Sequence, residues 1–359
     1  MQRIIFIGTH RLNRSPSQRF RFEQYFSLLQ MHGFSCHLLP LLDEADDKIF
    51  YSKGNFMKKT GIAVRTFFKR KNDLKFIREN DIVFIQREAF MTGSLFFEKA
   101  LKRKNVKMVY DFDDAIWLPN VSENNKKFEW LKNPSKTSAL ITLADMVIAG
   151  NQYLASYAKK FNHSVYVIPT TIDTSYHRKK NETDSKTVCI GWTGSHTTIR
   201  HYESAVPALK KLKQKYSDKI YFKVIGDAGY INTDLNIHGI EWFLKNELEQ
   251  LSEIDIGIMP LPDNEWTRGK CGLKGLQYMA LEIPSVMSPV GVNCEIVSDG
   301  VNGFLAKDEN EWIEKVSVLI ENPEVRKKIG EEARKTVEEK YSVNSQKEKY
   351  LALFKKLAS

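Results

Sequence analysis

The chain has 359 residues, 42% of them hydrophobic and 27% charged, which suits a folded protein of two domains and excludes a disordered chain. No apolar run reaches the roughly 18 residues that a membrane-spanning helix needs, and its four scattered cysteines lack the spacing of a zinc site or a disulfide framework. The formal net charge of +10 indicates an anionic partner such as nucleic acid, an acidic membrane surface or a phosphorylated small molecule.

The first half alternates short apolar runs with helical patterns. The N-terminal sequence MQRIIFIGTH has a short apolar core at 4–8, which predicts a first strand and not a signal peptide, so we expect a cytoplasmic protein. A helix is predicted over 20–33, ending at Gly33. Further strands are predicted at 36–39, 81–86, 107–112, 145–150 and 165–169. This alternation predicts a parallel sheet flanked by helices.

The loop after the first strand is basic. The segment THRLNRSPSQRFR (9–21) contains side chains that could bind a phosphate or an anionic acceptor: Arg14, Ser15, Ser17, Arg19 and Arg21. Arg19 is the strongest candidate because it lies at the start of the following helix. A solvated basic loop is the alternative.

A second basic segment mixes cations with aromatic side chains. KGNFMKKTGIAVRTFFKRK (53–71) has seven Lys or Arg and no acid. Such an amphipathic pattern suits an anionic membrane surface, and basic patches with aromatics also suit single-stranded nucleic acid. A helix that packs its apolar side on the core is the third alternative.

Three carboxylates gather at the end of a predicted strand. In YDFDDAIW (110–117), the residues Asp111, Asp113 and Asp114 would repel one another unless cations, hydroxyls or a helix dipole compensate. We consider a metal site, a helix N-cap and a site that faces a cleft. In a cleft, one of these carboxylates could orient or activate an acceptor hydroxyl, so we treat all three as candidate catalytic residues.

The alternation restarts in the second half, after a polar stretch at 169–186. Strands are predicted at 186–192, 219–226, 239–244, 254–260, 283–288 and 302–306. We therefore expect an α/β fold with two doubly wound domains, over 1–170 and 171–342. A last amphipathic helix at 343–359 is expected to pack back onto the first domain, with its own domain as the alternative. Because open α/β sheets bind ligands at the carboxyl ends of their strands, the active site is expected where two such edges face each other.

The turn after the first strand of the second half could bind an oxyanion. GWTGSHTT (191–198) places Thr193, Gly194 and Ser195 between a strand and a helix. Glycine allows close backbone approach, and the hydroxyls could either cap the helix or donate to an anion. A purely structural turn is equally compatible with this pattern.

A pair of lysines opens a later helix. In GKCGLKGLQ (269–277), a helix is predicted to begin near Cys271, so the amides of Gly272, Leu273 and Lys274 would lie at the positive end of the helix dipole. Lys270 and Lys274 add positive charge at that end, which is favourable only if an anion binds between them. The sequence therefore predicts a diphosphate anchor, with two solvated lysines as the alternative.

The region 272–306 contains a spaced set of residues: Gln277, Tyr278, Met279, Ala280, Pro284, Ser288, Gly291, Glu295, Gly300 and Gly303. This set resembles the donor-binding region of family 4 (retaining) glycosyltransferases of the GT-B fold. The family pattern has one Glu, seven further residues, a second Glu and then spaced Pro, Ser, Gly and Glu residues. The resemblance implies two Rossmann-like domains facing a cleft, with 1–170 as the acceptor domain and 171–342 as the domain that binds the nucleotide-sugar donor.

This sequence departs from the family pattern at both glutamates. Gly269 stands at the first position, so recognition of the donor sugar must come from elsewhere, with Asp263 and Glu265 as candidates. Gln277 stands at the second position and could still hydrogen-bond ribose hydroxyls. The family's Arg and Lys phosphate anchors are also missing from 191–198, so we infer that the positive charges have moved into 270–274.

The resemblance also implies partners. Residues 239–243, including Trp242, would contact the base, and Gly291 and Asn293 would lie near the donor sugar. We expect transfer of a sugar from a nucleoside diphosphate to a glycan or lipid-linked acceptor, as in surface polysaccharide synthesis, without a cofactor or metal. Association of 53–71 with the inner face of the membrane is then favoured over nucleic acid. The alternative function is an inactive protein that binds sugar nucleotides or nucleic acid.

Overall fold

A computed structural model describes residues 1–52, 54–118, 133–179 and 187–358. Residue 53 of the basic segment 53–71 and residues 180–186 of the polar stretch 169–186 therefore lie outside the described residues. The chain divides into two compact units. Unit 1 contains Met1–Pro169 and Lys347–Ser359, and unit 2 contains Thr170–Gln346.

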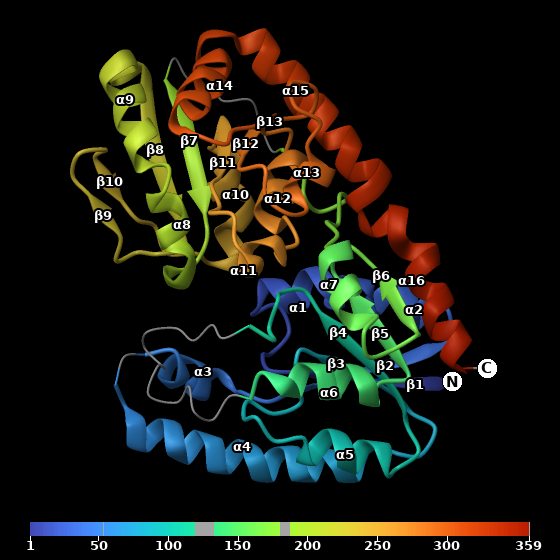
Figure 1. Cartoon of the computed structure of the whole chain (residues 1–359). Helices are drawn as coiled ribbons and strands as arrows, with labels where there is room; N and C mark the ends of the chain where they lie inside the picture. The colour runs from blue at the N-terminus through green and yellow to red at the C-terminus, as the bar shows by residue number, and fades with distance from the viewer. Residues whose placement is uncertain (53, 119–132, 180–186, 359) are drawn as a thin grey trace. The chain divides into compact units, whose positions relative to one another are not determined.

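Unit 1 is built on one parallel sheet of six strands. Their order is β2-β1-β3-β4-β5-β6, and every neighbouring pair is parallel (Figure 1). The strands are β1 (Gln2–Gly8), β2 (Phe34–Pro40), β3 (Ile82–Gln86), β4 (Lys107–Phe112), β5 (Met146–Ala149) and β6 (Val165–Val167). Each of them overlaps a strand predicted from the apolar runs.

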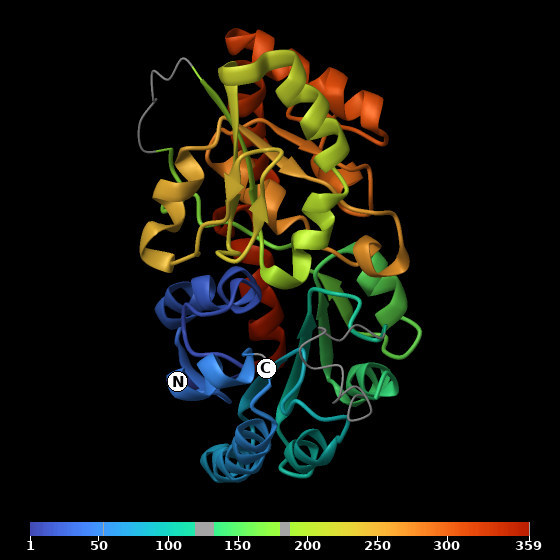
Figure 2. The same cartoon turned by 90° about the vertical axis from the view of Figure 1, so that its left-hand side faces the viewer.

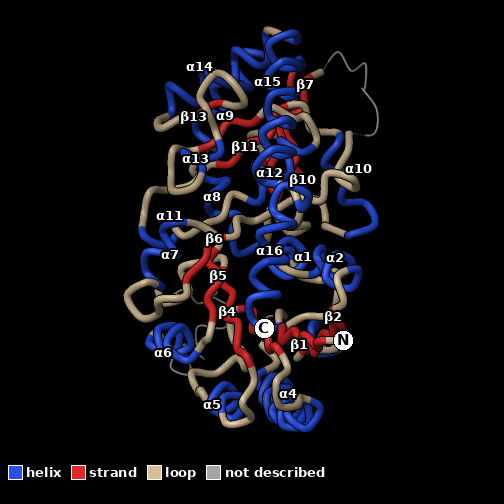
Figure 3. Tube along the Cα trace, turned by 90° about the vertical axis from the view of Figure 1, so that its right-hand side faces the viewer, coloured by secondary structure: helices blue, strands red, loops and turns tan. Residues whose placement is uncertain are grey.

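Helices cover both faces of this sheet. In Figure 3, α4, α5 and α6 lie on one face and α1, α2 and α16 on the other. The helices of unit 1 before its end are α1 (Pro16–Arg21), α2 (Phe26–Met31), α3 (Glu44–Phe50), α4 (Phe56–Phe76), α5 (Phe96–Lys102), α6 (Ser135–Leu143) and α7 (Gln152–Ala158).

The predicted helix over 20–33 is interrupted. Phe22 (φ −143°, ψ −32°) separates α1 from a 3-10 turn, Glu23–Tyr25, that leads into α2. Its ring packs in the core, with ring centroids 5.1 Å from Phe6 and 5.4 Å from Phe84. The break therefore serves aromatic packing, which the helical periodicity does not reveal. The helical stretch does end at Gly33, whose φ of +85° is the left-handed conformation that glycine favours.

The last helix, α16 (Val343–Ala358), contributes its final turns to unit 1. Tyr350 stacks on Tyr25 with ring centroids 3.9 Å apart, and Phe354 packs 6.5 Å from Phe6 and 6.3 Å from Phe84. These aromatic side chains are buried. The amphipathic pattern at 343–359 thus forms a helix whose apolar face completes the core of unit 1.

Unit 2 contains a parallel sheet of five strands in the order β13-β12-β11-β7-β8 and a short antiparallel hairpin (Figure 1, and turned by 90° in Figure 2). The strands are β7 (Val188–Thr193), β8 (Ile220–Ile225), β9 (Ile231–Asn232), β10 (Ile237–His238), β11 (Ile256–Met259), β12 (Ser285–Met287) and β13 (Phe304–Leu305). The strand predicted at 239–244 is wrong: Ile240 forms only an isolated bridge to Ile225, and a 3-10 turn, Leu244–Asn246, follows.

Two apolar clusters hold the helices of unit 2 against opposite faces of its sheet. Helices α9 and α14 bury Leu209, Leu212 and Val316 against β7 and β8, while α10 and α12 bury Leu248 and Tyr278 on the other side. The helices are α8 (Ile199–Glu203), α9 (Val206–Tyr216), α10 (Glu247–Ser252), α11 (Glu265–Arg268), α12 (Leu273–Ala280), α13 (Asn293–Ile296), α14 (Glu309–Glu321) and α15 (Pro323–Thr336).

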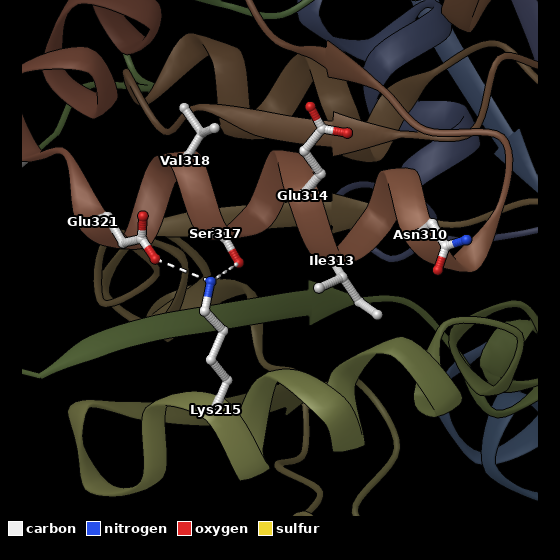
Figure 4. Close-up of a pocket in the computed structure, with 7 residues that line it drawn as sticks. All are labelled: Lys215, Asn310, Ile313, Glu314, Ser317, Val318 and Glu321. Atoms are coloured by element: carbon white, nitrogen blue, oxygen red, sulfur yellow. Dashed lines mark hydrogen bonds and ion pairs between the residues drawn. The ribbon is translucent and has the colours of Figure 1, made fainter.

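A groove of about 350 Å³ lies between α9 and α14. Figure 4 shows Lys215 reaching from α9 toward α14, where its Nζ lies 3.1 Å from Glu321 and 3.4 Å from Ser317. Among the described residues, no helix is both long enough and apolar enough to span a bilayer.

Candidate active site

Two glycines bring the ends of β7 and β8 together in unit 2. A Cβ on Gly226 (φ +107°) would lie 1.7 Å from the carbonyl oxygen of Gly194, and one on Gly194 would meet the Trp192 ring at 2.2 Å. The Thr193 amide donates a 2.8 Å hydrogen bond to the Tyr278 hydroxyl, which joins β7 to α12. The turn at Gly194 is thus fixed by close packing on both sides.

Ser195 caps the helical turn that follows. Its amide donates to the Thr198 hydroxyl at 2.9 Å, and its own hydroxyl lies 2.9 Å from that of Thr197. The side chain remains exposed. The structure shows Ser195 in the capping role. An anion could approach its hydroxyl only from the exposed side.

Helix α12 begins where the lysine pair predicts. Gly272 is its N-cap with φ +71°, and a Cβ there would lie 2.3 Å from Ile296. Glycine is therefore required both by the left-handed backbone and by the packing. The first-turn amides of any helix lack partners within the helix, so those of Leu273 and Lys274 lie at its positive end.

The two lysines of this segment lie over indole rings. Lys274 Nζ is 5.1 Å from the Trp192 ring centroid, and Lys270 Nζ is 5.2 Å from that of Trp266. Such cation–π contacts hold an ammonium group in place. Both ammonium groups therefore lie beside the start of α12. Their charge adds to the positive end of the helix dipole, so this region favours an anion.

A buried histidine lies close to both lysines. His201 is 3% exposed, and its Nδ1 has no hydrogen-bond partner. Burial, together with the charges of Lys274, Arg200 and Lys270, lowers the pKa of His201 to about 4. The imidazole is therefore neutral at pH 7. No pattern in the sequence singled out this residue, because its surroundings come from two distant segments.

We expect His201 to make unit 2 less stable in acid. Its folded pKa of about 4 lies below the ordinary value of 6.5, so the unfolded chain binds more protons between these values and stability falls as pH drops through this window. The slope is at most about 1.4 kcal/mol per pH unit. Urea unfolding at pH 7 and pH 5 should show a smaller loss of stability for His201→Gln than for the unchanged protein. An equal loss in both would contradict this account.

A buried carboxylate links two of the predicted nucleoside-contacting residues. Glu247 Oε1 accepts hydrogen bonds from Gln277 Nε2 at 3.3 Å and from Trp242 Nε1 at 3.2 Å. Glu247 is 3% exposed and lies in the first turn of α10. No sequence pattern marks Glu247, yet this residue brings a carboxylate next to Gln277, which stands where the family has a glutamate.

Two further predicted donor residues, Gly291 and Asn293, lie near the start of α12. Gly291 (φ +53°) approaches the backbone of Arg268, since a Cβ there would lie 2.8 Å from the Arg268 oxygen. Asn293 is fully buried and donates to the Ser288 carbonyl at 3.0 Å, while its Oδ1 has no hydrogen-bond partner. A Cβ on Gly272 would lie 3.9 Å from that Oδ1.

The two acids proposed to replace the missing glutamate have different surroundings. Asp263 forms a two-bond ion pair with Arg268, at 2.7 and 3.0 Å, and both side chains are about half exposed. Glu265 is exposed in the first turn of α11. A ligand could therefore contact Glu265 directly, whereas it could bind Asp263 only after the ion pair with Arg268 is broken.

In unit 1, the first of the three clustered carboxylates is an internal ion pair. Asp111 and Arg21 are each about 1% exposed and meet at 2.5 Å, and Arg21 Nη1 also donates to the Ile168 carbonyl. Burial raises the pKa of Asp111, and Arg21 opposes that rise. The structure therefore shows Asp111 in an internal ion pair with Arg21, and its catalytic role stays a prediction.

The other two carboxylates share one guanidinium group. Arg87 Nε donates to Asp113 at 2.8 Å and Arg87 Nη2 to Asp114 at 2.6 Å, while the Ser17 hydroxyl donates to Asp113 at 2.6 Å. Burial works to raise the pKa of Asp113, but Arg87 and Ser17 outweigh it and lower the pKa. Residues 113–118 form bends and turns, so the helix N-cap alternative is wrong.

Arg19 lies in unit 1 and is 8% exposed. Its guanidinium carbon lies 4.9 Å from the Phe20 ring centroid, and its charge acts on the buried Glu23. A role in donor binding stays a prediction. Among the described residues, no group of three or more His, Cys, Asp or Glu side chains is arranged to hold a metal ion.

Comparison with known proteins finds a similarity to one family within unit 2. Residues 187–322, which include the lysine pair and the Glu247 contacts, match the family described as glycosyl transferases group 1. These residues are therefore similar to a glycosyltransferase group 1 domain, over less than half of the chain. The trehalose synthase of Thermococcus litoralis is 30% identical over 139 residues, which is 37% of this chain but only 32% of that enzyme. The chain thus matches a third or less of the length of the trehalose synthases.

Solved structures extend the similarity to the whole fold. Sucrose-phosphate synthase of Thermosynechococcus elongatus has a TM-score of 0.71 at 12% identity, with 99% of both chains covered. The Anabaena protein HepE, in complex with UDP-glucose, has a TM-score of 0.65 at 13% identity and covers 99% of this chain and 100% of its own. The glycosyltransferase group 1 domain is therefore part of a chain with the GT-B fold, as the α/β pattern and the resemblance predicted.

Proposed function

We propose that this protein is a glycosyltransferase that moves a sugar from a nucleoside diphosphate to a glycan or lipid-linked acceptor. The observation that carries the proposal is the start of α12 inside the glycosyltransferase group 1 domain, where Lys270 and Lys274 lie beside the positive end of the helix dipole. A diphosphate matches this arrangement, because helix N-termini and ammonium groups both stabilise phosphate oxygens.

The diphosphate would become the leaving group of the reaction. Cleavage of the bond between sugar and phosphate places negative charge on the departing oxygen, and the lysines with the α12 amides would stabilise that charge. The domain described as glycosyl transferases group 1 supports transfer as the reaction class. We propose retention of the anomeric configuration and chemistry without a metal from the family resemblance.

The nucleoside would bind beside the Glu247 cluster. Because Gln277 Nε2 donates to Glu247, its carbonyl oxygen is oriented to accept a hydrogen bond from a ribose hydroxyl. The same carboxylate fixes Trp242, whose indole could contact the base. Gly291 and Asn293, next to the α12 start, are the proposed neighbours of the sugar, with Glu265 as a candidate acid.

The function is tested with the purified full chain and a panel of UDP-, GDP- and dTDP-sugars. We expect at least one donor to release its nucleoside diphosphate faster than in a protein-free control, with faster release when lipid-linked or oligosaccharide acceptors are added. Activity should persist in EDTA. Tight nucleotide binding without any turnover would instead favour an inactive binding protein, a possibility raised by Gly269 in place of a carboxylate.

We also propose that α4 of unit 1 associates with an anionic membrane surface. Its outward side exposes Met57 (90%), Val64 (55%) and Phe68 (60%), with the exposed Lys58 and Lys71 beside them. The opposite side is held by the buried Arg70, which donates to the carbonyls of Gly8, Leu39 and Ala89. Exposed apolar side chains flanked by cations are typical of helices that lie in a membrane interface.

Removing the exposed cations of α4 should weaken binding to vesicles. The variant Lys58→Gln/Lys71→Gln/Lys75→Gln loses three charges that are each worth about 1 kcal/mol near an anionic surface, so co-sedimentation with phosphatidylserine-containing liposomes should fall by roughly 100-fold in affinity. The matched control Lys327→Gln/Lys328→Gln/Lys335→Gln removes three exposed charges from α15. Equal binding of both variants would refute the membrane role of α4.

A further inference from the structure

The loops that follow β7 and β8 leave the sheet of unit 2 side by side. A Cβ on Gly226, directly after β8, would lie 1.7 Å from the carbonyl oxygen of Gly194, directly after β7. The Gly194 amide also donates a 2.9 Å hydrogen bond to the Ile225 carbonyl. Because open α/β sheets bind ligands outside the carboxyl ends of their strands, the side chains of these two loops border a place where a ligand would bind.

A histidine and an aspartate join the two loops. His196 Nδ1 lies 3.2 Å from Asp227 Oδ2. The Asp227 side chain is 11% exposed, and its Oδ1 accepts a 3.2 Å hydrogen bond from the Gly229 amide. The His196 side chain, in contrast, is 62% exposed. The carboxylate is therefore fixed and sheltered, while the imidazole extends from it toward solvent.

The carboxylate sets the tautomer of this imidazole. An ionised carboxylate can only accept a hydrogen bond, so His196 Nδ1 carries the proton that it donates to Asp227. In the neutral imidazole the other nitrogen, Nε2, then offers a lone pair. His196 thus presents a hydrogen-bond acceptor at the outer end of its ring, and a ligand that suits it must bring a donor.

This acceptor lies close to the start of α12. Trp192 is the link, because Lys274 Nζ lies 5.1 Å from its ring centroid and a Cβ on Gly194 would meet the same ring at 2.2 Å. His196 is two residues beyond Gly194, a separation that spans at most about 7 Å. The imidazole and the Lys274 ammonium group are therefore near enough to contact different parts of one bound sugar nucleotide.

The chemistry of the neighbouring groups matches each of them to a different part of that ligand. Phosphate oxygens only accept hydrogen bonds, so they suit the lysine pair at 270 and 274 and are disfavoured by the Nε2 lone pair and the charge of Asp227. The ribose is expected at Gln277. Sugar hydroxyls can donate, and position 269, where a carboxylate was expected to accept from them, is glycine. A hydroxyl of the donor sugar is therefore the partner that fits His196.

We propose that His196, oriented by Asp227, accepts a hydrogen bond from a hydroxyl group of the donor sugar and thereby contributes to the choice of that sugar. The inference rests on the proposed function, because it needs a sugar nucleotide bound at the start of α12. His196 contacts the sugar directly, and Asp227 is a positioning residue that keeps the acceptor nitrogen directed outward. The pair supplies the acceptor that Gly269 does not provide.

Isothermal titration separates a sugar contact from a diphosphate contact. The full chain and its His196→Ala variant are titrated with UDP-glucose, UDP-N-acetylglucosamine, GDP-mannose and dTDP-glucose, and with UDP, GDP and dTDP. We expect His196→Ala to weaken binding of at least one sugar nucleotide by roughly two- to tenfold, the effect of one hydrogen bond, and to change the affinity for the matching nucleoside diphosphate by less than about twofold. Because the His196 side chain is mostly exposed, its removal should leave the fold intact.

Deoxyfluoro analogues of the bound sugar nucleotide identify the hydroxyl. Fluorine replaces a hydroxyl group but cannot donate a hydrogen bond, so one analogue should bind the unchanged protein more weakly than its parent does. The same analogue and its parent should bind His196→Ala equally well, which closes a double-mutant cycle. Asp227→Asn should reduce the difference between parent and analogue, whereas a purely structural role of Asp227 would leave that difference unchanged.

Several results would overturn the proposal. His196→Ala would then weaken the sugar nucleotide and the nucleoside diphosphate equally, or weaken neither, or every analogue would lose as much affinity for this variant as for the unchanged protein. Binding of nucleoside diphosphates without binding of any of the four sugar nucleotides would overturn it as well. A protein that binds none of these nucleotides would refute the proposed function itself, and this inference with it.

Discussion

Replacing Lys270 and Lys274 together by alanine is expected to weaken nucleoside diphosphate binding by at least about 100-fold. Each hydrogen bond from a charged group to the diphosphate contributes about 1.5–3 kcal/mol, and every 1.4 kcal/mol changes the dissociation constant tenfold. The two lysines lie over Trp192 and Trp266 at the start of α12, so both charges are already placed and little side-chain entropy is lost on binding. Isothermal titration with UDP, GDP and dTDP measures the effect.

The matched control for the lysine pair is Lys327→Ala/Lys328→Ala. These two exposed lysines of α15 lie in the same unit, and their removal changes the net charge by the same amount. We expect this control to keep the affinity within about twofold, because exposed distant charges are screened. If both double variants lose affinity equally, the effect comes from net charge and the phosphate-anchor proposal fails.

The variant Arg21→Met should destabilise unit 1 by about 3–5 kcal/mol. It would leave the Asp111 carboxylate buried without its partner, and breaking a buried ion pair on one side costs this much. The Ile168 carbonyl would lose its donor as well. Denaturant unfolding followed by hydrogen exchange of the β1 and β4 peptides measures the loss where the pair lies.

Two comparisons separate the ion pair from general damage. Arg21→Met combined with Asp111→Leu should recover most of the loss, because an apolar pair of similar volume avoids the buried charge. Lys48→Ala removes an exposed ion pair with Glu44 in α3 and should have no measurable effect. If the double variant is no more stable than Arg21→Met alone, the carboxylate is not the source of the destabilisation.

Much of the fold could be predicted from the sequence because parallel strands leave a local signal. A strand buried on both faces reads as a short run of apolar residues, and β1, β3 and β4 all do so. The one wrong strand, at 239–244, lies where Gly239 packs against a carbonyl of Asp227. That close approach depends on a residue outside the segment, so the apolar run by itself wrongly predicts a strand.

The candidate site could be predicted from the sequence only where its residues lie in a single segment of the chain. The start of α12 is local, since Gly272 and the lysines are neighbours in sequence. Glu247 and His201 reach the same region from α10 and α8, and nothing in their own segments marks them. Likewise, Arg87 follows a different strand from Asp113 and Asp114 and neutralises both of them. Because the sequence does not reveal this pairing, it suggested a more exposed acidic cluster than the structure shows.

A crystal structure of the full chain with bound UDP tests most directly whether the donor diphosphate binds at the start of α12. We expect phosphate oxygens within hydrogen-bond distance of the Leu273 and Lys274 amides, with at least one of the Lys270 and Lys274 ammonium groups beside them. Clear density for the diphosphate elsewhere in unit 2, or in unit 1, would contradict it.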